Sequence, residues 1–221
     1  MSADPIEVRV GELRRALRGP TRRKRCLLAE ARDGLLDAAA AHRARGADPG
    51  TAARRAVAEF GTVAELAPGY QAELSAAQGR RTAVLAGLAF PGMTVGWDLL
   101  WSSGVSWGGP VSEQVRVMAT AQDATAGAVA VAAIVGLVLL GLGARRGAPA
   151  RHAVLAIGLL ATLGALGCGG LAVTMNVLAG AGAVELLATN PTAWPAFAVS
   201  TAVMAVLLRS GVRSVRLARA G

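Results

Sequence analysis

Four long apolar stretches constrain the fold of this chain more than any other feature. They cover residues 82–101, 124–143, 153–178 and 194–208. The first three reach the roughly 20 residues that a helix needs to cross about 30 Å of hydrocarbon. The fourth is short and contains Pro195, so it would span only with its flanks drawn inward and Arg209 snorkelling to the interface. We therefore expect an all-α protein with a four-helix transmembrane bundle.

The ends of these stretches differ in charge, which predicts an orientation. Arginines gather at every second end: Arg80 and Arg81 before the first stretch, Arg145, Arg146 and Arg151 between the second and third, and Arg209, Arg213, Arg216 and Arg219 after the fourth. The two loops between the other ends of the stretches contain a single basic residue, Arg116. The positive-inside rule then predicts a multi-pass protein of the cell membrane with both termini in the cytoplasm. The tryptophans fall near the predicted outer ends, as an aromatic belt would require: Trp97, Trp101, Trp107 and Trp194.

Composition limits what else the chain contains. With 221 residues, 53% of them hydrophobic, there is room for one small head, residues 1–78, and a membrane domain, residues 79–221. A large catalytic domain does not fit in this length. The net charge of +9 lies mainly beside the predicted bilayer, where anionic head groups attract basic residues. Residues 1–80 lack the apolar run of a signal peptide, so we expect the head to stay in the cytoplasm.

The head has the pattern of short, capped helices. Asp4-Pro5 predicts a helix start, and Gly19-Pro20 an end. A second helix is expected over residues 22–45, a third after Asp48-Pro49, and a fourth from the capping box Thr62-x-x-Glu65. These helices share apolar faces that predict one small core.

Two segments of the head stand out, residues 27–37, LLAEARDGLLD, and residues 54–67, RRAVAEFGTVAELA. Through these segments the head, over about residues 6–75, resembles a known family, the HAAS module, also described as a permease prefix domain. The family pattern is an amphipathic helix, an acidic helix ending near a glycine, and a helix closing on a Phe-Gly corner. The sequence departs from that pattern at Ala67-Pro68-Gly69, where the family would continue as helix.

The resemblance implies signalling rather than chemistry. HAAS modules are similar in being cytoplasmic adaptors associated with PadR-like winged-helix transcription regulators, and related prefixes precede ABC-type permease domains. We therefore expect a membrane-anchored adaptor, with an accessory subunit of an ABC-type permease as the alternative. The partner-binding residues expected on the head surface are Arg32, Asp33, Asp37, Glu59, Phe60 and Glu65.

Other function classes find little support in the sequence. No span offers paired carboxylates, a histidine-rich motif or a nucleophile beside a base, so we expect no enzyme, no cofactor and no metal. His42 and His152 are isolated and are expected at the surface or the interface, and Cys26 and Cys168 are expected to be packing residues. The basic run around residues 14–25 lacks a recognition-helix pattern and interleaved aromatics, so we do not expect direct nucleic-acid binding.

Within the membrane domain several alternatives stay open. Asp98 is the one acid inside a span, and its place between Trp97 and Trp101 favours a hydrated interfacial position over an ion site. Small residues at four-residue intervals favour packing within the chain over formation of a homo-oligomer: Ala128, Ala132, Gly136, Ala161, Ala165 and Gly169. Residues 78–81 are either a flexible tether or part of one helix that continues from the head. In the loop 102–123, Pro110 would start a short surface helix with Val111, Val115 and Met118 on one side.

Overall fold

The computed structural model describes residues 4–105, 112–146 and 150–220. Every regular element in these ranges is an α-helix, which confirms the predicted all-α fold. The chain divides into two compact units, a head up to Gln78 and a bundle of Gly79–Arg219. Trp107 and Pro110 lie outside the described residues.

The head consists of α1 (Pro5–Ala16), α2 (Thr21–Ala44), α3 (Pro49–Phe60) and the first part of α4 (Val63–Ser102). The predicted caps form: Asp4 Oδ1 accepts from the Ile6 N–H at 3.0 Å, and Asp48 Oδ1 accepts from the Thr51 N–H at 3.0 Å. Such caps satisfy N–H groups that have no partner inside the helix. The locally encoded helix starts were therefore predicted correctly.

One apolar core holds the head together. Its buried side chains come from all four of these helices: Ile6, Val10, Leu13, Leu17, Leu27, Leu28, Leu35, Ala39, Ala56 and Leu74. Full burial of each leucine contributes about 1.5–3 kcal/mol. Gly19 lets the chain pass close to this core, because a Cβ at that position would lie 2.9 Å from Leu74 Cβ. The glycine between α1 and α2 therefore serves packing as well as helix termination.

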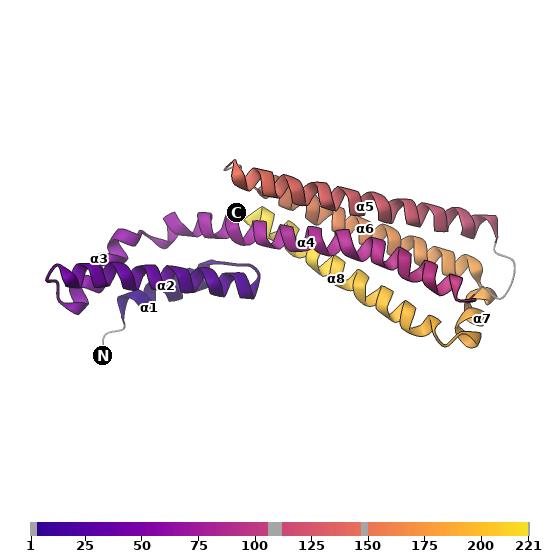
Figure 1. Ribbon diagram of the computed structural model, residues 1–221, viewed down its shortest axis with the longest axis horizontal. Helices are drawn as coiled ribbons and strands as arrows, with labels where there is room; N and C mark the ends of the chain where they lie inside the picture. Colours follow the sequence, from indigo (N-terminus) through magenta and orange to yellow (C-terminus); the bar gives the residue numbers. More distant parts are fainter. Residues whose placement is uncertain (1–3, 106–111, 147–149, 221) are drawn as a thin grey trace. The chain divides into compact units, whose positions relative to one another are not determined.

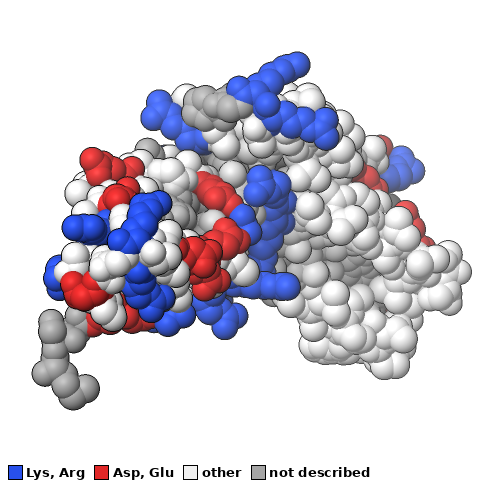
Figure 2. All heavy atoms as spheres, turned by 60° about the vertical axis from the view of Figure 1, so that its left-hand side comes forward, with Lys and Arg blue, Asp and Glu red and all other residues white. Residues whose placement is uncertain are grey.

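The bundle is formed by the remainder of α4 with α5 (Glu113–Arg145), α6 (Arg151–Ala179), α7 (Ala181–Thr189) and α8 (Ala193–Ala220). Helices α4, α5, α6 and α8 are each long and apolar enough to cross a membrane. Helices α5 and α6 lie side by side over much of their length (Figure 1). The apolar composition of these helices is visible at the surface: Figure 2 shows a wide area without charged side chains, bordered by basic side chains. The described chain thus has the elements of a four-span membrane protein.

Small side chains dominate the middle of the bundle. Phe90 of α4 and Leu207 of α8 are the largest buried residues of a cluster otherwise made of alanines, Val129 and Cys168. Gly164 allows α6 to approach α5, because a Cβ there would lie 2.8 Å from Val129 Cγ2. Gly136 does the same against Ile157 Cγ1, also at 2.8 Å. The predicted close packing within the chain is confirmed at these positions, whereas Ala128 is exposed and Gly169 has open space beside it.

Several helices extend past the apolar stretches from which they were predicted. Helix α8 has 28 residues because its basic end is helical as well, so it is longer than the apolar stretch 194–208. Helix α5 already starts after Ser112, so Val115 and Met118 lie in its first turns and not in a separate surface helix. Helix α4 is assigned without a break from Val63 to Ser102, through Pro68, Gly69 and Gly79. Of the two alternatives for residues 78–81, the helical one is observed.

Candidate partner-binding surface of the head

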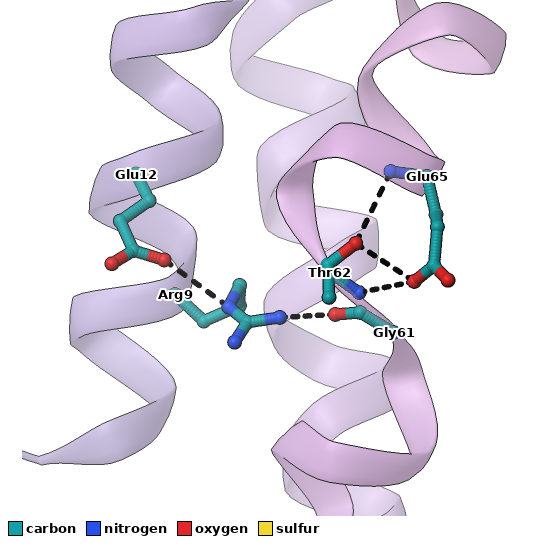
Figure 3. A network of polar contacts seen from close by, with 5 residues as sticks. All are labelled: Arg9, Glu12, Gly61, Thr62 and Glu65. Carbon is teal, nitrogen blue, oxygen red and sulfur yellow. Dashed lines mark hydrogen bonds and ion pairs between the residues drawn. The ribbon is translucent and has the colours of Figure 1, made fainter.

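The corner between α3 and α4 is fixed by a polar network (Figure 3). Gly61 adopts φ +96°, a conformation that costs glycine little. Its carbonyl accepts a hydrogen bond from the Arg9 guanidinium of α1, and Arg9 Nε also lies 3.2 Å from Glu12 Oε2. Arg9 therefore joins α1 to a corner 52 residues further along the chain.

The first turn of α4 is closed by the predicted capping box. The Thr62 N–H donates to Glu65 Oε2 at 2.7 Å, the Thr62 hydroxyl donates to the same oxygen at 2.8 Å, and the Glu65 N–H donates to Thr62 Oγ1 at 3.3 Å. The backbone and side-chain hydrogen bonds from Thr62 hold the pKa of Glu65 below its ordinary value. Glu65, expected to contact a partner, is exposed, but one of its carboxylate oxygens serves this cap.

Two further expected partner residues lie at the end of α3. Phe60 is half-buried and packs against the head core, so much of its ring is unavailable to a partner. Glu59 is exposed, and its Oε2 lies 3.0 Å from His42 Nε2. The prediction that His42 is a surface residue was wrong, because only 7% of it is exposed. His42 continues the buried stripe of Leu35 and Ala39 at helical spacing, a pattern that would have identified it.

The remaining three expected residues lie on α2. Arg32 Nε contacts Glu7 Oε1 of α1 at 2.6 Å, so its charge is already paired. Asp33 and Asp37 are exposed, are four residues apart, and have no cation within ion-pair distance in the described head. Residues at this spacing share one face of a helix. These two carboxylates are the expected partner residues that the fold leaves unused.

No hydrogen bond or ion pair between described residues joins the three expected residues on α2 to the three at the α3–α4 corner. The six therefore do not form one polar network. The α2 carboxylates form an open acidic face, and Glu59 and Glu65 belong to pairs that also stabilise the head.

Two contacts of the head were not foreseen from the sequence. Gln71 of α4 pairs with the backbone of Arg18, accepting from its N–H at 2.9 Å and donating to its carbonyl at 2.9 Å. Arg23 of α2 forms an ion pair with Glu73 of α4. Both tie the start of α4 to the α1–α2 connection. Cys26, expected to pack, is exposed because it lies off the buried stripe of α2.

The expected membrane-interface residues lie at the two ends of the bundle. Trp97 Nε1 donates to Ser200 Oγ of α8 at 3.1 Å, and its ring stacks on Trp101 and meets Phe197 edge to face. Trp194 is 60% exposed and donates to the Leu187 carbonyl at 3.0 Å. Asp98 is exposed on α4 beside this aromatic group. Of the expected arginine anchors, Arg145 and Arg146 lie at the end of α5, whereas Arg80 and Arg81 lie within α4 and Arg209 lies within α8.

Two packing features of the bundle were also missed. The Thr82 hydroxyl of α4 is fully buried and lies 2.7 Å from Ser210 Oγ and 2.8 Å from Ser214 Oγ of α8. Gly158 of α6 and Gly211 of α8 meet at a close crossing, where a Cβ on Gly211 would lie 2.8 Å from the Gly158 carbonyl oxygen. Small residues in α8 alone do not disclose which helix they face.

Comparison of the chain with protein-family models, with curated proteins and with solved structures found no match. In the described residues, no group of three or more histidine, cysteine or acidic side chains is arranged to hold a metal ion.

Proposed function

We propose that this chain is a membrane-anchored signalling adaptor whose head binds a PadR-like winged-helix transcription regulator and couples it to the state of the membrane. The resemblance of residues 27–37 and 54–67 to HAAS modules suggests this class of partner. The arginine distribution favours an inner, cytoplasmic position for the head, where such a regulator is found. In this proposal the chain performs no catalytic step.

One observation carries the proposal: the acidic face of α2 is exposed although the head core beneath it is complete. Leu35 and Ala39 are buried on one side of α2, and Asp33 and Asp37 are exposed on the other. Most other head carboxylates at helix contacts already serve a cap or an ion pair. A face of this kind suits a basic surface on a partner, because opposite charges steer association and fix register.

The test is site-specific photocrosslinking of the full-length protein in bacterial cells. A photoreactive amino acid replaces Asp33 or Asp37, and mass spectrometry identifies the captured protein. We expect a winged-helix regulator from both positions and none from Ala16, an exposed control residue on α1. Capture of an ATPase instead would support the accessory-subunit alternative and contradict the adaptor proposal.

Charge reversal provides an independent check. The double variant Asp33→Lys/Asp37→Lys should reduce recovery of the regulator by about tenfold, since each rim charge contributes modestly to an interface. The paired control is Arg14→Glu/Arg15→Glu, which changes exposed charges on α1. Equal recovery with both double variants would show that the acidic face of α2 is not the binding surface.

A further inference from the structure

Three arginines of α8 form a stripe on the side opposite its packed face. Arg209, Arg213 and Arg216 are exposed and fall within about 60° of arc and about 10 Å of helix length. Leu207, Ser210 and Ser214 occupy the buried side of the same turns. The arginines therefore project away from the bundle interior as a group.

Helix α4 adds a fourth guanidinium at the same level. Thr82 bonds to Ser210 and Ser214, which fixes this part of α4 beside this part of α8. Arg81 is the residue before Thr82 and is exposed, so it lies within about one residue of rise, ~1.5 Å, of the Thr82 level. The buried hydroxyl cluster thus brings two basic segments together that are about 130 residues apart in sequence.

Among the described residues of the bundle, no acidic side chain forms an ion pair with these arginines. Helix α8 contains no acidic residue, and α4 has none between Glu73 and Asp98. The four acids of the bundle lie elsewhere: Asp98 near the end of α4, Glu113 and Asp123 in the first three turns of α5, and Glu185 in α7. The ion pair found within the described part of the bundle joins Arg116 to Glu113 at the start of α5 and does not include Arg81, Arg209, Arg213 or Arg216. Each unpaired guanidinium presents five N–H donors in a fork that matches phosphate oxygens.

The surface next to the arginines identifies the ligand class. Val84 and Leu88 of α4 and Val206 of α8 are 44%, 71% and 50% exposed, and they follow within two turns of Arg81 or Arg209. The surface therefore changes from guanidinium to aliphatic over a short distance. A phospholipid carries the same two chemical groups in the same order, a phosphate followed by acyl chains, whereas a nucleic acid has no aliphatic chain to contact the second part.

We propose that the α4–α8 face is a discrete binding site for an anionic phospholipid, in which Arg81, Arg209 and Arg213 hold the phosphate and Arg216 adds positive charge. The acyl chains lie along Val84, Leu88 and Val206. This site is separate from the acidic face of α2 and does not depend on the identity of a regulator. It differs from the general attraction of basic residues to a membrane because it requires these particular side chains.

Native mass spectrometry of the full-length protein tests the site. The protein is released from detergent micelles containing phosphatidylglycerol or phosphatidylcholine, and retained lipid is counted. The wild-type chain should retain phosphatidylglycerol in preference to phosphatidylcholine. Arg209→Gln/Arg213→Gln should reduce retention about tenfold, because each basic residue near a phosphate contributes appreciably. The matched control Arg145→Gln/Arg146→Gln removes the same charge from the end of α5 and should stay within about twofold of wild type.

The charge-conserving variant Arg209→Lys/Arg213→Lys keeps the site testable if the glutamine variant does not fold. Lysine preserves the charge but loses the bidentate geometry, so retention should fall about threefold. Equal retention of the two lipids by wild type, equal loss in the α5 control, or full displacement of lipid by inorganic phosphate would each overturn the proposal. Displacement by phosphate would indicate an ion site without acyl-chain contacts.

Discussion

The crossing of α6 and α8 gives the sharpest quantitative prediction for the bundle. In Gly211→Ala the new Cβ would lie 2.8 Å from the Gly158 carbonyl oxygen and 3.0 Å from the Thr162 amide nitrogen, and it would also overlap Thr162 Oγ1. Two of these atoms belong to the α6 backbone, which cannot rotate away as a side chain can. The helices must therefore separate by roughly half an ångström to restore ordinary contact distances.

Separation of the helices has a cost that exceeds the gain in helix propensity. Overpacking of this kind costs about 1–3 kcal/mol, and it also strains the neighbouring Thr82–Ser210–Ser214 hydroxyl cluster. Replacing glycine by alanine in a helix interior stabilises the helix by up to about 1 kcal/mol through its higher helix propensity. Gly141→Ala on α5 is the matched control, because a Cβ there meets nothing within 4 Å. We expect Gly211→Ala to be about 2 kcal/mol less stable than this control.

Cys168 provides the assay. It is 2% exposed in the bundle core, whereas Cys26 on the head is exposed, so a Cys26→Ser background leaves one buried thiol. Labelling of Cys168 by a thiol-reactive fluorophore during heating then reports opening of the bundle. Gly211→Ala should open about 5 °C or more below Gly141→Ala. Equal labelling temperatures would refute the close approach of α6 and α8.

Three further predictions concern other parts of the chain. Hydrogen bonds from Thr62 lower the pKa of Glu65, so the Glu65 carboxylate stabilises the head above its ordinary pKa of 4.5, and this stabilisation is lost as the pH falls through the lower pKa of the folded state. Circular dichroism from pH 7 to 3 should therefore show a weaker pH dependence of stability in Glu65→Gln than in the wild type. Identical curves would argue against the capping box. Thr82→Ala should cost about 1 kcal/mol in the Cys168 assay, with recovery in Thr82→Ser, and no loss in the alanine variant would mean that the hydroxyl cluster contributes nothing. Hydrogen exchange over residues 70–82 should be slow because α4 is helical throughout this segment, and exchange as fast as in an unstructured peptide would identify a tether instead.

Features encoded within a few residues were predictable from the sequence. The caps at Asp4, Asp48 and Thr62 formed as expected because each depends on a side chain and a backbone N–H two or three residues away. The apolar spans were also recognisable, since the length and composition of a continuous segment decide whether a helix can cross a bilayer. Where the apolar pattern stopped, however, the helices did not, so α5 and α8 extend beyond the apolar stretches 124–143 and 194–208.

Features that depend on which helices meet were not predictable. Gly158 and Gly211 stand in runs of small residues that look alike in the sequence, and only the fold selects the pair that touches. Gln71 contacts the backbone of Arg18, which is 53 residues away in the sequence, and no local pattern indicates that contact. Of the expected partner residues, Phe60 and Glu65 proved to serve the head itself, because the corner they occupy must also be packed and capped. Asp33 and Asp37 keep their expected role as a proposal.

The orientation of the head is the claim on which the account depends most, and Cys26 tests it directly. Its thiol is exposed on the head, while Cys168 is buried, so a membrane-impermeant maleimide reports the side on which the head lies. We predict that Cys26 reacts only after the cells are permeabilised, and that Ser103→Cys in a Cys26→Ser background, at the opposite end of α4, reacts in intact cells. Labelling of Cys26 in intact cells would contradict a cytoplasmic head and, with it, the proposed regulator.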